Sequence, residues 1–270
     1  MTRITGPGVA VPGGTNAAPH GSGWRSGLRG GAGGLPLEAA ARPAGQGDGR
    51  RAGRQEAGAG PAGSRPQGNA PATAGGDGER WRLFIAVPVT GPAAGTLQAW
   101  MAAGRRQRPG LKWVEPHHLH VTLRFLGERP AAEVPALVAA GARVAGAAAP
   151  VEAEIRGVGG FPDIGRARTV WAGVAAGAAE LAGMAAGLER ELLAVAPDLD
   201  PVTQPFRAHV TLARVRGGWI DLTAWPHAAG ARDRVWGRLV VREMVLFRSQ
   251  LRPGGPVYTP LHRWGLGSRD

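Results

Sequence analysis

The sequence predicts an α+β protein of two pseudo-symmetric lobes, each an antiparallel sheet with helices on its outer face, around a central cleft. Two observations predict this class. Residues 80–267 alternate between strand and helix patterns, and the order strand, helix, strand occurs twice there. Each occurrence ends in a strand with the same tetrapeptide, His-Val-Thr-Leu, so we expect the two strands to face each other across the cleft.

The first occurrence starts at Trp81. Its elements are, in order, a strand at 81–89, a helix at 93–106, a short strand at 112–114 and the tetrapeptide strand at 118–126. The helix is indicated by Leu97, Trp100 and Met101, which lie on one helical face at i, i+3 and i+4. Pro109-Gly110 then breaks it.

The second occurrence lies within the rest of the domain. The elements expected there are a helix at 130–144, strands at 151–158 and 167–174, a helix at 178–195, the second tetrapeptide strand at 206–215, and strands at 238–249 and 257–264. The helix at 178–195 carries an apolar stripe of Leu181, Met184, Leu188 and Leu192. The repeated unit is therefore 167–174, 178–195 and 206–215.

Residues 1–79 differ in composition from the rest of the chain. They hold 22 of the 45 glycines, and Trp24 is their only aromatic residue. Such a segment buries too little apolar surface to offset its ordering entropy, so we predict a disordered Gly/Pro/Ala/Arg-rich extension ahead of one domain at 80–267. Three interpretations stay open: an RNA-tethering arm, a dispensable extension, or a start codon assigned too far upstream.

The charge balance favours anionic partners, unless a high-GC coding bias toward Arg, Gly, Ala and Pro accounts for it. The formal net charge is +12 and almost all basic residues are arginine, because Lys112 is the only lysine. The chain has no cysteine, which excludes disulfides and thiolate zinc sites and suits a reducing compartment. It also lacks a signal-like segment or a run of ~20 apolar residues. We expect a cytoplasmic monomer that does not bind membranes.

The candidate catalytic groups are His120 and His209 with Thr122 and Thr211. Side chains at i and i+2 of a strand point to the same face, so each strand presents one imidazole and one hydroxyl together. Two imidazoles can exchange protons near neutral pH, and hydroxyls can donate hydrogen bonds to phosphate oxygens. This set suits acid–base cleavage of a phosphate ester, and we expect no metal and no cofactor.

Two arginines are candidates for binding the substrate phosphate. Arg124 continues the face of His120 and Thr122 by period 2. In the second strand the corresponding position is Ala213, and Arg214 nominally points to the other face. Arg214 is therefore the weaker candidate.

The chain resembles the 2H phosphoesterase superfamily, and within it the bacterial and archaeal RNA 2′,3′-cyclic phosphodiesterases once called 2′-5′ RNA ligases. The resemblance covers about residues 81–266. It is carried by five segments in the same order: RLFIAVPV at 82–89, WVEPHHLHVTLRFLGE at 113–128, GGFPDIGRARTVWAGV at 159–174, FRAHVTLAR at 206–214 and LFRSQLRPGGPVYTPLHRW at 246–264.

The resemblance implies metal-independent hydrolysis of a 2′,3′-cyclic phosphate at RNA 3′ ends, or on small nucleotides, to a 2′-phosphate. It also implies the roles: His120 as the proton donor to the leaving oxygen and His209 as the proton acceptor that activates water. The residues alone do not assign these two roles. Two alternatives stay open: a ligase or phosphodiesterase acting on 2′-5′ linkages, and a non-catalytic domain that binds RNA ends.

Overall fold

The computed structural model describes residues 78–267. The strands are β1 (Arg80–Pro88), β2 (Lys112–Trp113), β3 (His120–Pro130), β4 (Val151–Phe161), β5 (Thr169–Val174), β6 (His209–Arg214), β7 (Val235–Val241), β8 (Glu243–Arg252) and β9 (Gly255–Gly265). The helices are α1 (Gly91–Gln107), α2 (Val134–Ala147), α3 (Ala178–Val195) and α4 (Pro226–Ala229), with 3₁₀ turns η1 (Pro116–His118), η2 (Ala131–Glu133) and η3 (Ile164–Arg166). The extension predicted at 1–79 lies, except for its last two residues, outside the described residues, and its disorder stays a prediction.

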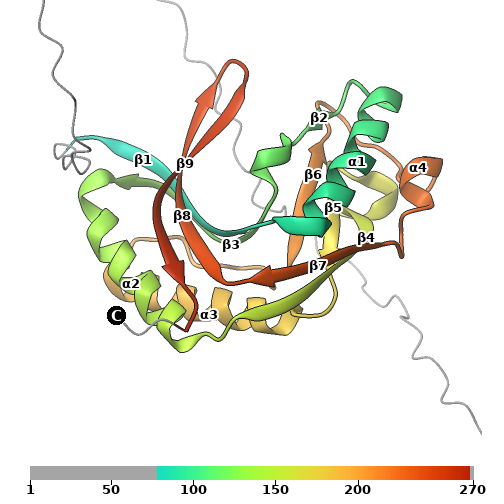
Figure 1. Cartoon of the computed structure of the whole chain (residues 1–270). Coiled ribbons are helices and arrows are strands. Elements are labelled where there is room, and N and C mark those ends of the chain that lie inside the picture. Colours follow the sequence, from blue (N-terminus) through green and yellow to red (C-terminus); the bar gives the residue numbers. More distant parts are fainter. Residues whose placement is uncertain (1–77, 268–270) are drawn as a thin grey trace, which may run out of the picture. The chain divides into compact units, whose positions relative to one another are not determined.

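The α+β class is confirmed, but the strands form one curled antiparallel sheet instead of two separate ones (Figure 1). Its strand order is β7-β4-β5-β6-β3-β1-β8-β9, and β2 pairs with β6 off this path. The two tetrapeptide strands, β3 and β6, are neighbours in the middle. They are joined through a single residue pair, Val121 and Val210. Each half of the sheet thus contributes one histidine strand to its centre.

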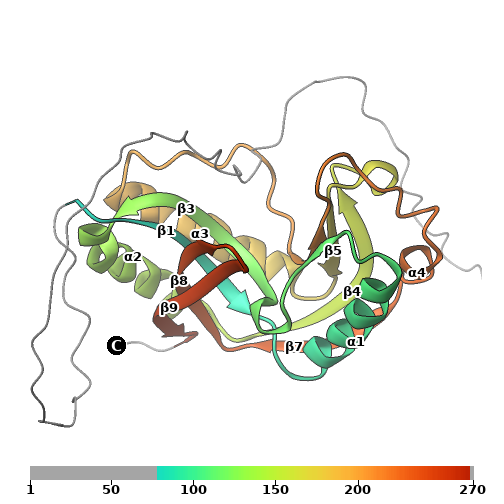
Figure 2. The same ribbon diagram turned by 90° about the horizontal axis from the view of Figure 1, so that it is seen from above.

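Helices α1 and α3 do not stay with the half of the sheet that precedes them in the chain. Helix α1 follows β1 but packs against β7, whereas α3 follows β5 but packs against α2 and β3 (Figure 2). The stripe predicted on α3 is confirmed, since Leu181, Leu188 and Leu192 are fully buried. Because each of these two helices packs on the other half of the sheet, the helices hold the halves together in addition to the single β3–β6 residue pair.

Most predicted elements are present with shifted bounds, and two differences are larger. The strand expected at 238–249 is two strands, β7 and β8, which are separated at Arg242. The short helix α4 has no counterpart in the prediction. In the described part of the chain, no helix is long and apolar enough to cross a membrane.

Candidate active site

The register of β3 and β6 places the four predicted catalytic side chains on one face of the sheet. Val121 and Val210 are directly opposite each other and fully buried, so both point to the helix-covered side. Their neighbours in each strand, two histidines and two threonines, point to the other side and are partly exposed. Extending the antiparallel register by one residue sets His120 opposite Thr211 and Thr122 opposite His209. Cβ atoms at such positions lie about 4.5–5.5 Å apart.

Both imidazoles are held by the same local hydrogen bond. Nδ1 of His120 lies 2.6 Å from the carbonyl oxygen of His118, and Nδ1 of His209 lies 2.6 Å from that of Arg207. A carbonyl oxygen only accepts, so each Nδ1 carries the hydrogen and donates it. Nε2 is therefore the nitrogen that takes up or releases a proton in both rings. A bond to residue i−2 fixes this tautomer within each strand.

Aromatic rings surround each histidine. The ring of His120 lies 5.2 Å from Phe84 and 5.6 Å from Tyr258, which comes from the β8–β9 hairpin. The ring of His209 lies 4.9 Å from Phe161 in an edge contact and 6.2 Å from Trp171. These walls restrict the orientation of both imidazoles and make their surroundings apolar.

His209 is biased toward the neutral form. Burial lowers its pKa below the ordinary histidine value, and the positive charge of Arg214 lowers it further. The hydrogen bond to the Arg207 carbonyl acts in the opposite direction, because it stabilises the ring when it is protonated. Burial is the largest of the three effects. At neutral pH this histidine is suited to accept a proton.

The structure does not bring Arg124 to the histidines. The pairing of β1 with β3 shifts between Thr122 and Arg124, which marks a β-bulge at that point. The bulge turns Arg124 to the helix-covered side, where it is paired with fully buried Ile85. Its Nε lies 2.7 Å from a carboxylate oxygen of Glu189 on α3. The period-2 extrapolation fails here because the bulge inserts one residue.

A matching bulge in β6 has the opposite result for Arg214. The pairing of β5 with β6 shifts between Thr211 and Ala213, so Ala213 is fully buried opposite Val170. Arg214 is then opposite Thr169, on the same face as His209 and Thr211. The structure thus groups Arg214, the weaker candidate, with the histidines.

Comparisons with known proteins identify the family of this chain. Residues 87–171 match a family model described as LigT like Phosphoesterase. An RNA 2′,3′-cyclic phosphodiesterase of Thermus thermophilus is 39% identical over 189 residues, which span 68% of this chain and 90% of the relative. The chain belongs to the LigT-like phosphoesterase family.

Solved structures show the same fold. The crystal structure of a Thermus thermophilus protein matches 70% of this chain and 100% of its own, with a TM-score of 0.60 and 34% identity. Escherichia coli LigT in complex with 3′-AMP matches 70% of this chain and 100% of its own, with a TM-score of 0.55 and 25% identity. The curled sheet is therefore the fold of LigT-like phosphoesterases.

Several residues around the site were not predicted. In this LigT-like phosphoesterase, Phe84, Tyr258 and Phe161 line the histidines, although each lies in a different strand from them. Trp171 fits beside His209 only because residue 159 is glycine: a Cβ there would come within 2.3 Å of the indole ring. Pairing between distant strands creates these neighbours, and no local pattern in the sequence marks them.

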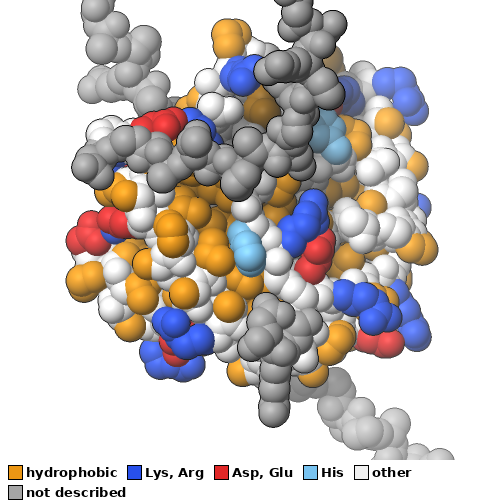
Figure 3. Space-filling view, turned by 60° about the vertical axis from the view of Figure 1, so that its left-hand side comes forward, with side chains coloured by type: hydrophobic (Ala, Val, Ile, Leu, Met, Phe, Trp, Pro, Cys, Tyr) orange, Lys and Arg blue, Asp and Glu red, His pale blue; other side chains and the backbone are white. Residues whose placement is uncertain are grey.

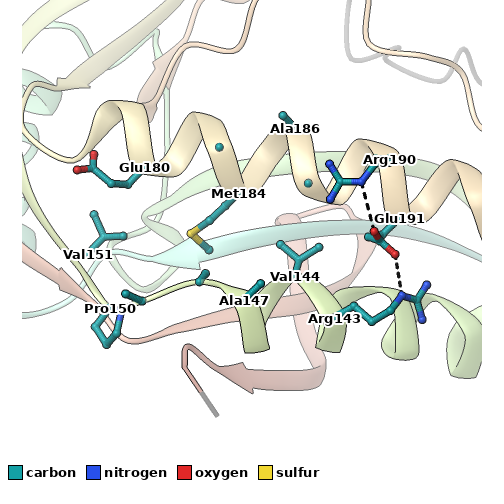
Figure 4. A pocket seen from close by; sticks show the side chains of 14 residues that line it. Arg143, Val144, Ala147, Pro150, Val151, Glu180, Met184, Ala186, Arg190 and Glu191 are labelled. Atoms are coloured by element: carbon teal, nitrogen blue, oxygen red, sulfur yellow. Dashed lines mark hydrogen bonds and ion pairs between the residues drawn. The ribbon is translucent and has the colours of Figure 1, made fainter. Parts of the chain in front are cut away.

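A separate hollow lies between α2 and α3 (Figure 4). Its volume is about 380 Å³, and small side chains line most of it. At one end Glu191 bridges Arg143 and Arg190. It contains none of the predicted site residues. Within residues 78–267, no group of three or more histidine, aspartate or glutamate side chains could hold a metal ion.

Proposed function

We propose that this LigT-like phosphoesterase hydrolyses the 2′,3′-cyclic phosphate at RNA 3′ ends to a 2′-phosphate, by a metal-independent two-histidine mechanism. The observation that carries the proposal is the shared face of His120, Thr122, His209 and Thr211, with Nδ1 of both rings bound to a backbone carbonyl. The substrate class is supported by the Thermus thermophilus relative, which is named an RNA 2′,3′-cyclic phosphodiesterase. The complex of Escherichia coli LigT with 3′-AMP supports a nucleotide ligand.

In this mechanism, neutral His209 takes a proton from water through Nε2 while the water oxygen bonds to phosphorus. The bond from phosphorus to the ribose 3′-oxygen breaks, and protonated His120 gives its Nε2 proton to that oxygen. The 2′-oxygen keeps the phosphate, and each proton transfer contributes about 10²–10⁴ in rate. The lowered pKa of His209 supports its assignment as the acceptor.

The threonine hydroxyls hold the phosphate between the histidines. Thr122 lies next to His209 in the register and Thr211 next to His120, so each proton-transfer group has a hydroxyl beside it. These hydroxyls donate hydrogen bonds to the non-bridging oxygens, where charge develops. We assign Arg214 to the same phosphate, because it lies on that face, and we leave Arg124 out of the site.

We also infer that the two halves of the sheet are related by a pseudo-twofold axis. The support is that β3 and β6 carry the same tetrapeptide, the same Nδ1 bond and a bulge at the same place. That the protein works as a cytoplasmic monomer stays a prediction.

The test is turnover of RNA oligonucleotides that end in a 2′,3′-cyclic phosphate, in excess EDTA, with identification of the product. We expect a 2′-phosphate and no loss of rate. Loss of activity in EDTA would refute the metal-independent mechanism. Cleavage or formation of 2′-5′ linkages in place of this hydrolysis would favour the ligase alternative, and tight binding without turnover would favour an RNA-end binder.

A further inference from the structure

Basic side chains gather at the end of β6, beyond the catalytic threonine. Arg214 pairs directly with Lys112 of β2, and directly opposite residues of a sheet share a face. Both cations therefore lie on the face that carries His209. Arg216 follows two residues later and is exposed.

An exposed tryptophan follows these cations. The chain turns after β6 through Gly217 and Gly218, whose φ angles of 66° and 74° suit glycine. The next residue, Trp219, has 53% of its surface exposed. The guanidinium carbon of Arg166 lies 5.5 Å from the centre of its ring, within the range of a cation–π contact. An exposed indole beside a cation is a stacking surface for a nucleobase.

Two carboxylates near this turn are engaged locally. Asp163 accepts hydrogen bonds from the backbone N–H groups of Gly165 and Arg166, and Asp221 accepts from Thr223. These two carboxylates stabilise the turns. The basic side chains of this region extend from Lys112 to Arg166. We call the set Lys112, Arg166, Arg214, Arg216 and Trp219 the Trp219 ridge.

The register also indicates where an RNA chain would lie. Because β3 and β6 are antiparallel, His120 is level with Thr211, and the end of β6 continues past His120, away from His209. If His120 protonates the 3′-oxygen, the ribose lies on the side of His120, opposite the attacking water. The nucleotides upstream of this ribose then leave the site toward Arg214 and Lys112.

We infer that the Trp219 ridge binds single-stranded RNA upstream of the cyclic phosphate, through its phosphates and one stacked base. This inference rests on the proposed function and specifies its substrate as an oligoribonucleotide. On the face in Figure 3, basic side chains lie singly or beside acidic ones. The ridge joins cations and an exposed indole directly to the catalytic face.

The experiment compares kcat/KM for two substrates: a mononucleoside 2′,3′-cyclic phosphate, and a five-nucleotide RNA with the same end. We expect the intact protein to favour the longer substrate. Trp219→Ala should lower kcat/KM for the pentanucleotide about fivefold or more and leave the mononucleotide unchanged. Arg166→Gln should also reduce the salt dependence of pentanucleotide binding. In a plot of the logarithm of the binding constant against the logarithm of the salt concentration, the slope should lose about 0.7 for each phosphate contact removed.

Two control variants lie away from the ridge. Arg242→Gln removes an exposed cation between β7 and β8, and Leu251→Ala shortens an exposed apolar side chain near the tip of the β8–β9 hairpin. Neither should change the ratio of the two kcat/KM values. The ridge proposal would be overturned if Trp219→Ala left the ratio of the two kcat/KM values unchanged, or if Leu251→Ala changed it instead. In either case, turnover of the mononucleotide would still support the proposed function. Absence of turnover on both substrates by the intact protein would overturn the proposed function itself.

Discussion

β3 and β6 carry the same tetrapeptide, the same Nδ1-to-carbonyl bond and a bulge after the same threonine, yet their arginines have different surroundings. The first residue beyond the bulge in β3 is Arg124, and it is buried against α3. The corresponding residue of β6 is Ala213, so the arginine follows one residue later and returns to the catalytic face. One position decides whether the guanidinium packs against α3 or lies on the face of the histidines.

This difference gives the two histidines unlike electrostatic surroundings. Burial lowers the pKa of His209 most, and a cation on its own face lowers this pKa further, whereas His120 is packed between Phe84 and Tyr258. A near-symmetric pair of strands can thereby supply an asymmetric pair of acid and base. The comparison predicts that equivalent substitutions in the two strands have equal effects at the histidines and unequal effects at the arginines.

The largest effect is expected at the histidines. His120→Ala and His209→Ala should each lower kcat by about 10²–10⁴, because each removes one proton transfer, while substrate binding persists. The measurement is steady-state turnover of an RNA with a cyclic-phosphate end. His117→Ala is the matched control, since His117 is exposed and lies outside the catalytic pair. If His120→Ala or His209→Ala kept a kcat near that of the intact protein, the substituted histidine would not take part in the mechanism.

The next effect is on stability and concerns Arg124. Besides its ion pair with Glu189, Arg124 donates to the carbonyl of Asp200, and Glu189 accepts from the N–H of Val202 at 2.9 Å. These contacts tie β3 to the segment that leads into β6. Glu189→Ala leaves the buried guanidinium without its carboxylate, so the free energy of unfolding should fall by about 3 kcal/mol or more.

The control for this ion pair lies on the same helix. Glu191 pairs with Arg143, whose side chain is 50% exposed, and Glu191→Ala should lower the free energy of unfolding far less, because solvent screens an exposed ion pair. Urea unfolding of both variants measures the difference. Equal losses would show that the Arg124 contacts do not fasten β3 to the segment before β6.

The alternation of side chains was enough to predict the α+β class and the common face of the four candidate residues. Period 2 placed His120 with Thr122 and His209 with Thr211, and these relations hold because no bulge falls between them. The same rule failed one step later, at Arg124 and Arg214, because a bulge is set by pairing with a distant strand. Phe84 and Tyr258 could not be predicted for a similar reason: long-range strand pairing and the curl of the sheet bring β1 and β9 to His120.

A smaller effect is expected at the threonines. Thr122→Val and Thr211→Val keep the β-branched shape but remove the hydroxyl, so each should cost about 1.5–3 kcal/mol in transition-state binding if the bond meets a charged oxygen. The measurement is kcat/KM, with Thr→Ser at the same position as the control that restores the hydroxyl. Similar losses in both strands would support the pseudo-twofold relation, and a loss in one strand alone would contradict it.

The smallest effect, a shift in pH dependence, separates the two arginines. Arg214 lowers the pKa of His209, so Arg214→Gln should raise that pKa toward the ordinary value of ~6.5. A base must be neutral to accept a proton; the acidic limb of the kcat/KM profile should therefore move to higher pH in this variant. Arg124 lies on the other side of the sheet, and Arg124→Met should not raise the limb in the same way. If Arg214→Gln leaves the acidic limb in place, either His209 is not the titrating base or the arginine does not act on it.

Buffers of constant ionic strength are required, because salt screens the interaction between the two groups. A limb that moves only in Arg214→Gln would tie the difference between the strands to the assignment of acid and base.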